Sequence, residues 1–475
     1  MGTVLNAQAA ASGGAFSAYI DWAAGLEWDD ISPTAKRRVV LVLADDMGAT
    51  FSAVDEPEVT AVRKRMVTGA RWVEGPLASL LAAGRPRVSV RQAAMGNGLA
   101  MGWNELDEGY RNAVCHAGLY VLPALLASAE AEGRSLEELL RAALLGYETV
   151  ARIARAYRFP ALTIHPHALL SPVGAAAGIG FLRRLPAPEL LSAVAGAATL
   201  GMAGPFNHAL QGVLARNTWA AQAAASGLAA VEWAQCGIGG QASSLHDVYV
   251  TALGADRVDL TAFAPHAGDG WAVESGYHKI NASCQYTHSA IEAVEALLAD
   301  HPELRGGESL VGIEVEAHPL AYALDDAQPA TTLGAKFSVP HAVAATLVHG
   351  DGGVGSFDAA SLGDPRVARL RNITRLVPFA DVRPPPDDRP ARVALTDRDG
   401  ERFEALCWSA AGGPDRPMAE AALWNKVATL SRAHAPGLAP TLRAIAQLVD
   451  DGNVDGLARP WRRWLDDVFA STPAT

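Results

Sequence analysis

The sequence has little of what disulfide frameworks, zinc knuckles and nucleic-acid surfaces are built from. Only four of its 475 residues are cysteine, and Cys115, Cys236, Cys284 and Cys407 are scattered without a Cys-x-x-Cys pair. This spacing fits a reduced cytoplasm, with no disulfide framework and no zinc knuckle. Lysine and arginine number 39 against 51 acids and form no cluster, so we expect no nucleic-acid partner.

Long apolar runs and the short motifs of several enzyme classes are also missing. Residues 1–16 lack a basic segment followed by an apolar one, so no signal peptide is predicted. The Ala/Gly-rich segment 193–206 is too short and too weakly apolar to span a bilayer, and we expect a cytoplasmic protein with no membrane partner. Gly-x-Gly-x-x-Gly, phosphate-loop and His-Glu-x-x-His motifs are absent, which leaves NAD, ATP and zinc-peptidase chemistry without support.

Helical patterns fill most of the first 275 residues. Ser32-Pro33 is a helix-start signal, and Ser135 forms a capping box with Glu138. Residues 1–15 are expected to be a mobile tail. Helical character is expected over residues 33–47, 77–83, 91–101, 118–130, 136–157, 174–185, 189–202 and 218–235.

The pattern changes after about residue 275. Strands are predicted over residues 311–317 and 372–377, a Pro/Asp-rich loop over 378–390, and a hairpin of 392–396 with 402–407. Helices return over residues 418–434, 440–449 and 454–470. The predicted fold is therefore mainly α. A large helical domain is built from both chain ends (1–275 and 411–475), and an α+β lid domain (276–410) is inserted into it.

One polar stretch, NGLAMGWNELDEGYRNAVCHAG at residues 97–118, stands out in the helical part. It opens with a predicted Gly-rich turn after Met95, and Glu105, Asp107 and Glu108 lie close together within it. His116 then follows, just before an apolar helix. Acids and a histidine on a loop over a rigid scaffold are typical of a functional site. The alternative is a solvated acidic turn that caps the next helix.

Further imidazoles and cations recur where predicted segments meet. They are His165, His167, Arg216, Lys279, Cys284 and His288. Taken singly, the histidine pair could be surface turn residues, the cysteine a packing residue and the lysine solvated. Two histidines two residues apart do not share a helix face, so metal binding is not favoured. Taken together, the groups predict a pocket between two domains, in which cations hold carboxylates and histidines move a proton.

The order of these segments resembles the MmgE/PrpD family, which includes 2-methylcitrate dehydratases, cis-aconitate decarboxylases and iminodisuccinate epimerase. The matching segments are Asn97-Gly98, Glu105–Glu108 with His116, GYETVARIARA at 146–156, His165-Pro166, the Lys279/Cys284/His288 segment and KFSVPH at 336–341. The resemblance spans nearly the whole chain. It implies a helical domain with an α+β lid, a pocket between them, a homodimer, and no metal or organic cofactor.

The resemblance implies a cofactor-independent lyase or isomerase of the dehydratase, decarboxylase or epimerase type. It would remove a proton next to a carboxylate on a di- or tricarboxylate-like substrate. The alternatives are a diverged biosynthetic enzyme with another proton-transfer or cyclisation step and, least expected, a non-catalytic binding protein. The expected catalytic residues are His116, His165, His288, Glu105, Asp107 and Lys279. The expected substrate-binding residues are Arg216, Lys279, Asn97, Tyr110, His167, Cys284 and His341.

Several positions depart from the family pattern. Glu105 and Glu108 replace aspartates of the acidic loop, Gly109 replaces a threonine, Arg216 a lysine and His341 a tyrosine, while Ile280 and Ala282 replace prolines. Because arginine stays protonated, residue 216 can anchor a carboxylate but should not shuttle protons. These changes predict a substrate that is larger or less charged than methylcitrate.

Overall fold

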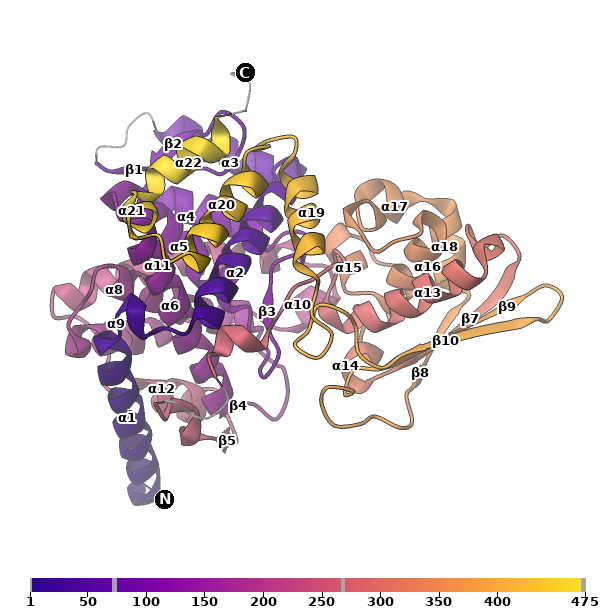
Figure 1. The fold of residues 1–475 in the computed structure, drawn as a ribbon. Helices are drawn as coiled ribbons and strands as arrows, with labels where there is room; N and C mark the ends of the chain where they lie inside the picture. The colour runs from indigo at the N-terminus through magenta and orange to yellow at the C-terminus, as the bar shows by residue number, and fades with distance from the viewer. Residues whose placement is uncertain (1, 71–74, 266–269, 471–475) are drawn as a thin grey trace.

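The computed structural model describes residues 2–70, 75–265 and 270–470. The fold is mainly α, as predicted. Figure 1 shows a large body of packed helices beside a smaller body that carries a four-stranded sheet. Within the described ranges, no helix is long and apolar enough to cross a membrane.

The helical body is assembled from both ends of the chain. Its hydrophobic core contains buried residues from 16 to 273 and again from 423 to 468. The N-terminal part supplies α1 (Gly2–Gly25), α2 (Pro33–Ser52), α3 (Pro57–Gly69), α4 (Val90–Met101), α5 (Ala117–Glu132), α6 (Leu136–Ala156), α7 (Pro166–Leu169), α8 (Ser171–Leu182), α9 (Ala187–Ala198), α10 (Asn207–Leu210), α11 (Thr218–Gln235) and α12 (Ser244–His246). The C-terminal part adds α19 (Glu420–Ser431), α20 (Leu438–Asp450), α21 (Val454–Ala458) and α22 (Trp461–Phe469). Both α19 and α20 pack against α2 (Figure 1).

Local signals in the sequence set several of these helices. The Ser32 hydroxyl accepts from the Ala35 backbone N–H at 3.2 Å and starts α2. The predicted capping box of Ser135 starts α6. Within α6, Arg152 Nε donates to Glu148 Oε1 at 2.6 Å, which confirms the predicted pair.

The smaller body has its own hydrophobic core, formed by residues between 209 and 407. Its sheet has the order β10-β9-β7-β8, with β7 (Leu310–Ala317), β8 (Thr374–Pro378), β9 (Ala391–Asp397) and β10 (Arg402–Cys407). Strands β9 and β10 form the predicted hairpin, and β7 runs parallel to β8. Its helices are α13 (His288–Asp300), α14 (Pro319–Tyr322), α15 (Thr332–Lys336), α16 (Val339–His349), α17 (Ala359–Gly363) and α18 (Pro365–Asn372). The boundaries at 276 and 410 stay a prediction.

Three predicted segments were wrong. Residues 2–15 belong to α1 rather than to a tail, because Phe16, Tyr19 and Ile20 anchor this helix in the core. Residues 77–83 contain a strand, β1 (Leu77–Ser79), which pairs antiparallel with β2 (Arg87–Ser89) across a turn. The predicted helix 454–470 is split into α21 and α22, because Pro460 lacks the N–H that a continuous helix needs.

Candidate active site

The acidic segment is buried. Glu105, Asp107 and Glu108 are at most 2% exposed, so the alternative of a solvated turn was wrong. The predicted turn after Met95 was also wrong, because α4 continues to Met101. Glu105 has a φ of 54°, a left-handed conformation that costs free energy for a residue with a side chain. The contacts of its carboxylate hold it there.

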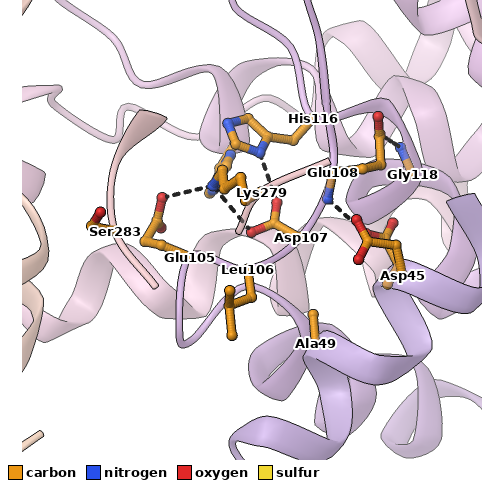
Figure 2. A network of polar contacts seen from close by, with 12 residues as sticks. Asp45, Ala49, Glu105, Leu106, Asp107, Glu108, His116, Gly118, Lys279 and Ser283 are labelled. Atoms are coloured by element: carbon orange, nitrogen blue, oxygen red, sulfur yellow. Dashed lines mark hydrogen bonds and ion pairs between the residues drawn. The ribbon is translucent and has the colours of Figure 1, made fainter. Parts of the chain in front are cut away.

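Two cations clamp the Glu105 carboxylate. Arg216 Nη1 lies 2.5 Å from Oε1, and Lys279 Nζ lies 3.3 Å from Oε2. Lys279 also lies 3.6 Å from Asp107 Oδ1, so its ammonium bridges two carboxylates (Figure 2). Burial opposes ionisation of Glu105, but the two cations outweigh it and lower its pKa to about 2. Burial would likewise lower the pKa of Lys279, but Asp107 and Glu105 raise it above the usual value.

Asp107 orients His116. Its Oδ2 lies 2.7 Å from His116 Nδ1, on the side of the carboxylate away from Lys279 (Figure 2). A carboxylate at this distance fixes the tautomer with the proton on Nδ1, which leaves Nε2 with a lone pair. His116 is therefore arranged as a base with a dedicated orienting acid.

His165 and His167 lie beside His116 and are buried, so a surface turn was the wrong alternative. The His167 ring centroid lies 4.4 Å from that of His165 and 4.9 Å from that of His116. Burial, followed by nearby Arg216, lowers the pKa of both His165 and His167 well below that of free histidine. His165 Nδ1 accepts from the His167 backbone N–H at 3.1 Å, and its Nε2 faces the Arg216 Nε–H at 3.4 Å, so both ring nitrogens are directed at donors.

Glu108 attaches the acidic segment to the helical body. Its backbone N–H donates to Asp46 Oδ1 at 2.9 Å, and its carboxyl accepts from Gly118 N at 2.7 Å and from the Tyr147 hydroxyl at 3.0 Å. A Cβ atom at Gly118 would lie 2.1 Å from Asp46 Oδ2, so only glycine fits there. Burial raises the pKa of Glu108 to about 8, so Glu108 is mainly protonated at neutral pH.

A cavity of about 40 Å³ lies between these groups. It brings together seven of the predicted site residues: Glu105, Tyr110, His116, His165, Arg216, Lys279 and Cys284. Asp107 does not line the cavity but contacts His116 and Lys279, which do. Burial raises the pKa of the Cys284 thiol to about 11, so this residue is not a thiolate nucleophile at neutral pH.

Besides Asp107, four predicted site residues do not line this cavity. Asn97 lies in α4, and its side-chain oxygen accepts from the Leu81 backbone N–H at 2.9 Å. His288 Nε2 lies 3.3 Å from the Ser283 carbonyl oxygen, and burial lowers its pKa to about 3. His341 Nε2 donates to the Ser356 carbonyl at 2.9 Å inside the smaller body. His167 packs edge-to-face against His116 and His165, and its Nδ1 lies 3.0 Å from the Tyr120 hydroxyl.

The structure also adds residues that the sequence did not single out. They include Phe206, Tyr277, Gln285, Tyr286, Phe337 and Arg389. Three of them are neighbours of Lys279 and Cys284 in sequence, a signal that could have found them. Arg389 lies within the predicted Pro/Asp-rich loop between β8 and β9, and no sequence signal pointed to it.

Gly109 leaves the space that Tyr277 occupies in the cavity wall. Strand β3 (Gly109–Tyr110) pairs antiparallel with β6 (Gly276–Tyr277), so Gly109 lies opposite Tyr277. A Cβ atom at position 109 would lie 2.3 Å from the Tyr277 hydroxyl oxygen. The glycine that replaces the family's threonine is therefore required by the aromatic ring above it.

Residues that could hold a metal do not gather at this site. No group of three or more His, Cys, Asp or Glu side chains in the described part of the chain has an arrangement that fits a metal ion. The cavity instead presents oriented imidazoles beside an arginine and a lysine, groups suited to proton transfer next to an anion.

Comparisons with known proteins identify the family of the chain. The model of the MmgE/PrpD N-terminal domain matches residues 18–250, and that of the MmgE/PrpD C-terminal domain matches residues 282–451. A search of curated proteins found no match. The chain belongs to the MmgE/PrpD family, whose members are typically dehydratases or related lyases.

Proposed function

We propose that the protein is a lyase or isomerase that removes a proton from the carbon next to a carboxylate and uses no cofactor. The observation that carries this proposal is the contact of 2.7 Å between Asp107 Oδ2 and His116 Nδ1 at the edge of a cavity that also contains Arg216 and Lys279. The two cations favour the negative charge that develops when the proton leaves.

In this reaction, His116 Nε2 takes the proton from the substrate carbon, and the electron pair of the C–H bond moves toward the carboxylate. Lys279 remains protonated and stabilises the resulting enediolate. His116, now an imidazolium, can pass that proton to a leaving hydroxyl, while the neutral ring of His165 lies beside the substrate as a hydrogen-bonding group. Loss of the hydroxyl gives a dehydratase, whereas return of a proton to the other face gives an epimerase.

Deuterium exchange tests the proposal without knowledge of the product. The protein is incubated in D₂O with 2-methylcitrate, cis-aconitate, iminodisuccinate and 3-hydroxyoctanoate, and deuterium at carbon is read by NMR. We expect incorporation into at least one acid and a loss of about 100-fold or more in His116→Gln, because a general base contributes this much. His434→Gln is the matched control, since His434 also pairs with an aspartate, Asp55, at 2.8 Å, but lies outside the cavity. Equal exchange in both variants, or none in any acid, would refute the proposal.

A further inference from the structure

A buried carboxylate on α2, that of Asp45, binds side chains from two distant parts of the chain. Its Oδ2 lies 2.8 Å from His278 Nδ1, and its Oδ1 accepts from Lys426 Nζ at 2.5 Å. Burial raises the pKa of Asp45, but Lys426 and His278 outweigh burial and hold it below its usual value. Asp45 is therefore ionised at neutral pH, and each of its oxygens has a partner.

The first partner belongs to the segment that carries the catalytic lysine. His278 directly precedes Lys279, the residue whose ammonium bridges Glu105 and Asp107. The backbone N–H of His278 donates to the Gly412 carbonyl at 3.0 Å, so its main chain is held from the other side. The imidazole contact thus ties this segment to α2 one residue before the ammonium that stabilises the enediolate.

The second partner reaches the acidic segment. Lys426 of α19 also donates to the Leu106 carbonyl at 2.8 Å. Leu106 lies between Glu105 and Asp107, the two carboxylates that Lys279 bridges, and Figure 2 shows Asp45 on its helix beside this segment. One carboxylate therefore connects the two segments that must meet in the site, one through an imidazole and the other through an ammonium.

The neighbouring residue of α2 provides only one of these connections. Asp46 Oδ1 accepts from the Glu108 backbone N–H at 2.9 Å, which holds the acidic segment alone. The contacts of Lys279 with Glu105 and Asp107, at 3.3 and 3.6 Å, depend on both segments. A displacement of about 1 Å in an active site can reduce the rate about 100-fold.

We infer that Asp45 is a positioning residue of the reaction, which sets the place of Lys279 relative to Glu105 and Asp107 by binding His278 with one oxygen and Lys426 with the other. Asp45 does not line the cavity and acts through these two partners. The inference rests on the proposed function, because it assigns to Lys279 the charge stabilisation described above.

Asp45→Asn tests the inference by kinetics. The amide has the same shape but offers one oxygen where the carboxylate offers two, so it cannot accept from both partners. In the exchange assay, we expect kcat to fall by about tenfold or more, with KM changed less than about threefold, since Asp45 touches no substrate. An unchanged kcat would overturn the inference.

Glu148→Gln is the matched control for loss of stability. It breaks a buried pair with Arg152 at 2.6 Å, and neither residue lines the cavity. Chemical denaturation gives the stability of both variants, and kcat is measured where each is fully folded. Glu148→Gln should keep its kcat. If it loses as much activity as Asp45→Asn, the effect of Asp45 is general destabilisation and the inference is wrong.

A spectroscopic measurement follows Lys279 without any turnover. The chain has only five lysines, at positions 36, 64, 279, 336 and 426, so ¹³C-labelled lysine gives five sets of ε-methylene signals. The set missing in Lys279→Met assigns that residue. We expect its signal to shift in Asp45→Asn and to stay in place in Glu148→Gln. A signal of Lys279 that Asp45→Asn leaves unmoved would overturn the inference.

Lys426→Met tests the same connection if Asp45→Asn does not fold. It removes the link to the Leu106 carbonyl and leaves the contact between Asp45 and His278 in place. We expect the Lys279 signal to shift and kcat to fall by about tenfold or more, because the acidic segment is released from α19. Retention of both the signal and kcat would contradict the inference.

The two proposals fail in different ways. A Lys279 signal that depends on Asp45, without His116-dependent exchange in any acid, would refute the proton transfer and leave the connection between Asp45 and Lys279 standing. Exchange that depends on His116, with normal kcat in Asp45→Asn, would refute the positioning role and leave the proton transfer standing.

Discussion

The backbone of Gly109 lies against the phenol of Tyr277, so closely that a Cβ atom at position 109 would come within 2.3 Å of the hydroxyl oxygen and of Cζ. The two residues are opposite each other where β3 pairs with β6. Because Tyr277 lines the inner cavity, the smallest residue of the acidic loop determines the position of an aromatic wall of the site.

Gly109→Ala should therefore displace Tyr277. We expect a fall of about tenfold or more in kcat/KM and a loss of about 1–3 kcal/mol of stability, the usual cost of overpacking a buried contact. Gly14→Ala is the matched control, because nothing lies within 4 Å of a Cβ built there. Thermal unfolding and the exchange assay measure both effects. A Gly109→Ala protein with normal activity would show that the position of Tyr277 is unimportant for turnover.

Asp107→Asn should remove the orientation of His116 and leave its ring in place. An amide at 2.7 Å from Nδ1 no longer favours the tautomer that leaves Nε2 free. We expect kcat to fall by about 100-fold or more with little change in KM, since substrate binding does not use Asp107 directly. Asp55→Asn, in the Asp55–His434 pair outside the cavity, should retain full kcat. Equal kcat in the two variants would contradict the role given to Asp107.

Arg216→Met should destabilise the fold more than the simultaneous replacement of Arg216 and Glu105 does. The variant leaves the Glu105 carboxylate buried with Lys279 alone, and breaking a buried pair costs about 3–5 kcal/mol. The double variant Arg216→Met/Glu105→Gln should recover part of this loss. Arg184→Met breaks an exposed pair with Glu27 and should cost less than about 1 kcal/mol. Chemical denaturation gives the three values. Additive losses in the double variant would show that the pair is not coupled.

Glu108 predicts a specific dependence of stability on pH. Its pKa is raised from 4.5 to about 8 in the folded protein, so between these values the folded state holds a proton that the unfolded chain has released. The stabilising contribution is complete below pH 4.5 and is lost as pH rises toward 8, with a slope of at most about 1.4 kcal/mol per pH unit. Glu108→Gln should flatten the stability curve in this window. Parallel curves for the two proteins would exclude Glu108 as the group responsible.

Features set by neighbouring residues were predictable from the sequence. The capping box at Ser135, the Glu148–Arg152 pair and the hairpin of β9 and β10 each depend on residues a few positions apart. The part of α1 before Phe16 was missed, because a run of small residues resembles a tail until Phe16 and Tyr19 are seen in the core.

The site was predicted only in part, because the sequence shows the order of the motifs and not how they pack. Order along the chain identified His116, Lys279 and Arg216, which the fold brings to one cavity. It could not separate them from His288 and His341, which occur in the same kind of segment but bond to backbone carbonyls elsewhere. Arg389 was not predicted, because its position at the cavity depends on how a loop distant in sequence packs.

Lys426 of α19 donates to the Leu106 carbonyl at 2.8 Å and to Asp45 at 2.5 Å. The segment that contains Glu105 and Asp107 is thus held by a side chain that lies 320 positions after Leu106 in the sequence. A chain that ends before α19 lacks this anchor, although the contacts of Glu108 with Asp46, Gly118 and Tyr147 are already available to it. The acidic segment is therefore expected to reach its final position only once α19 has packed against α2.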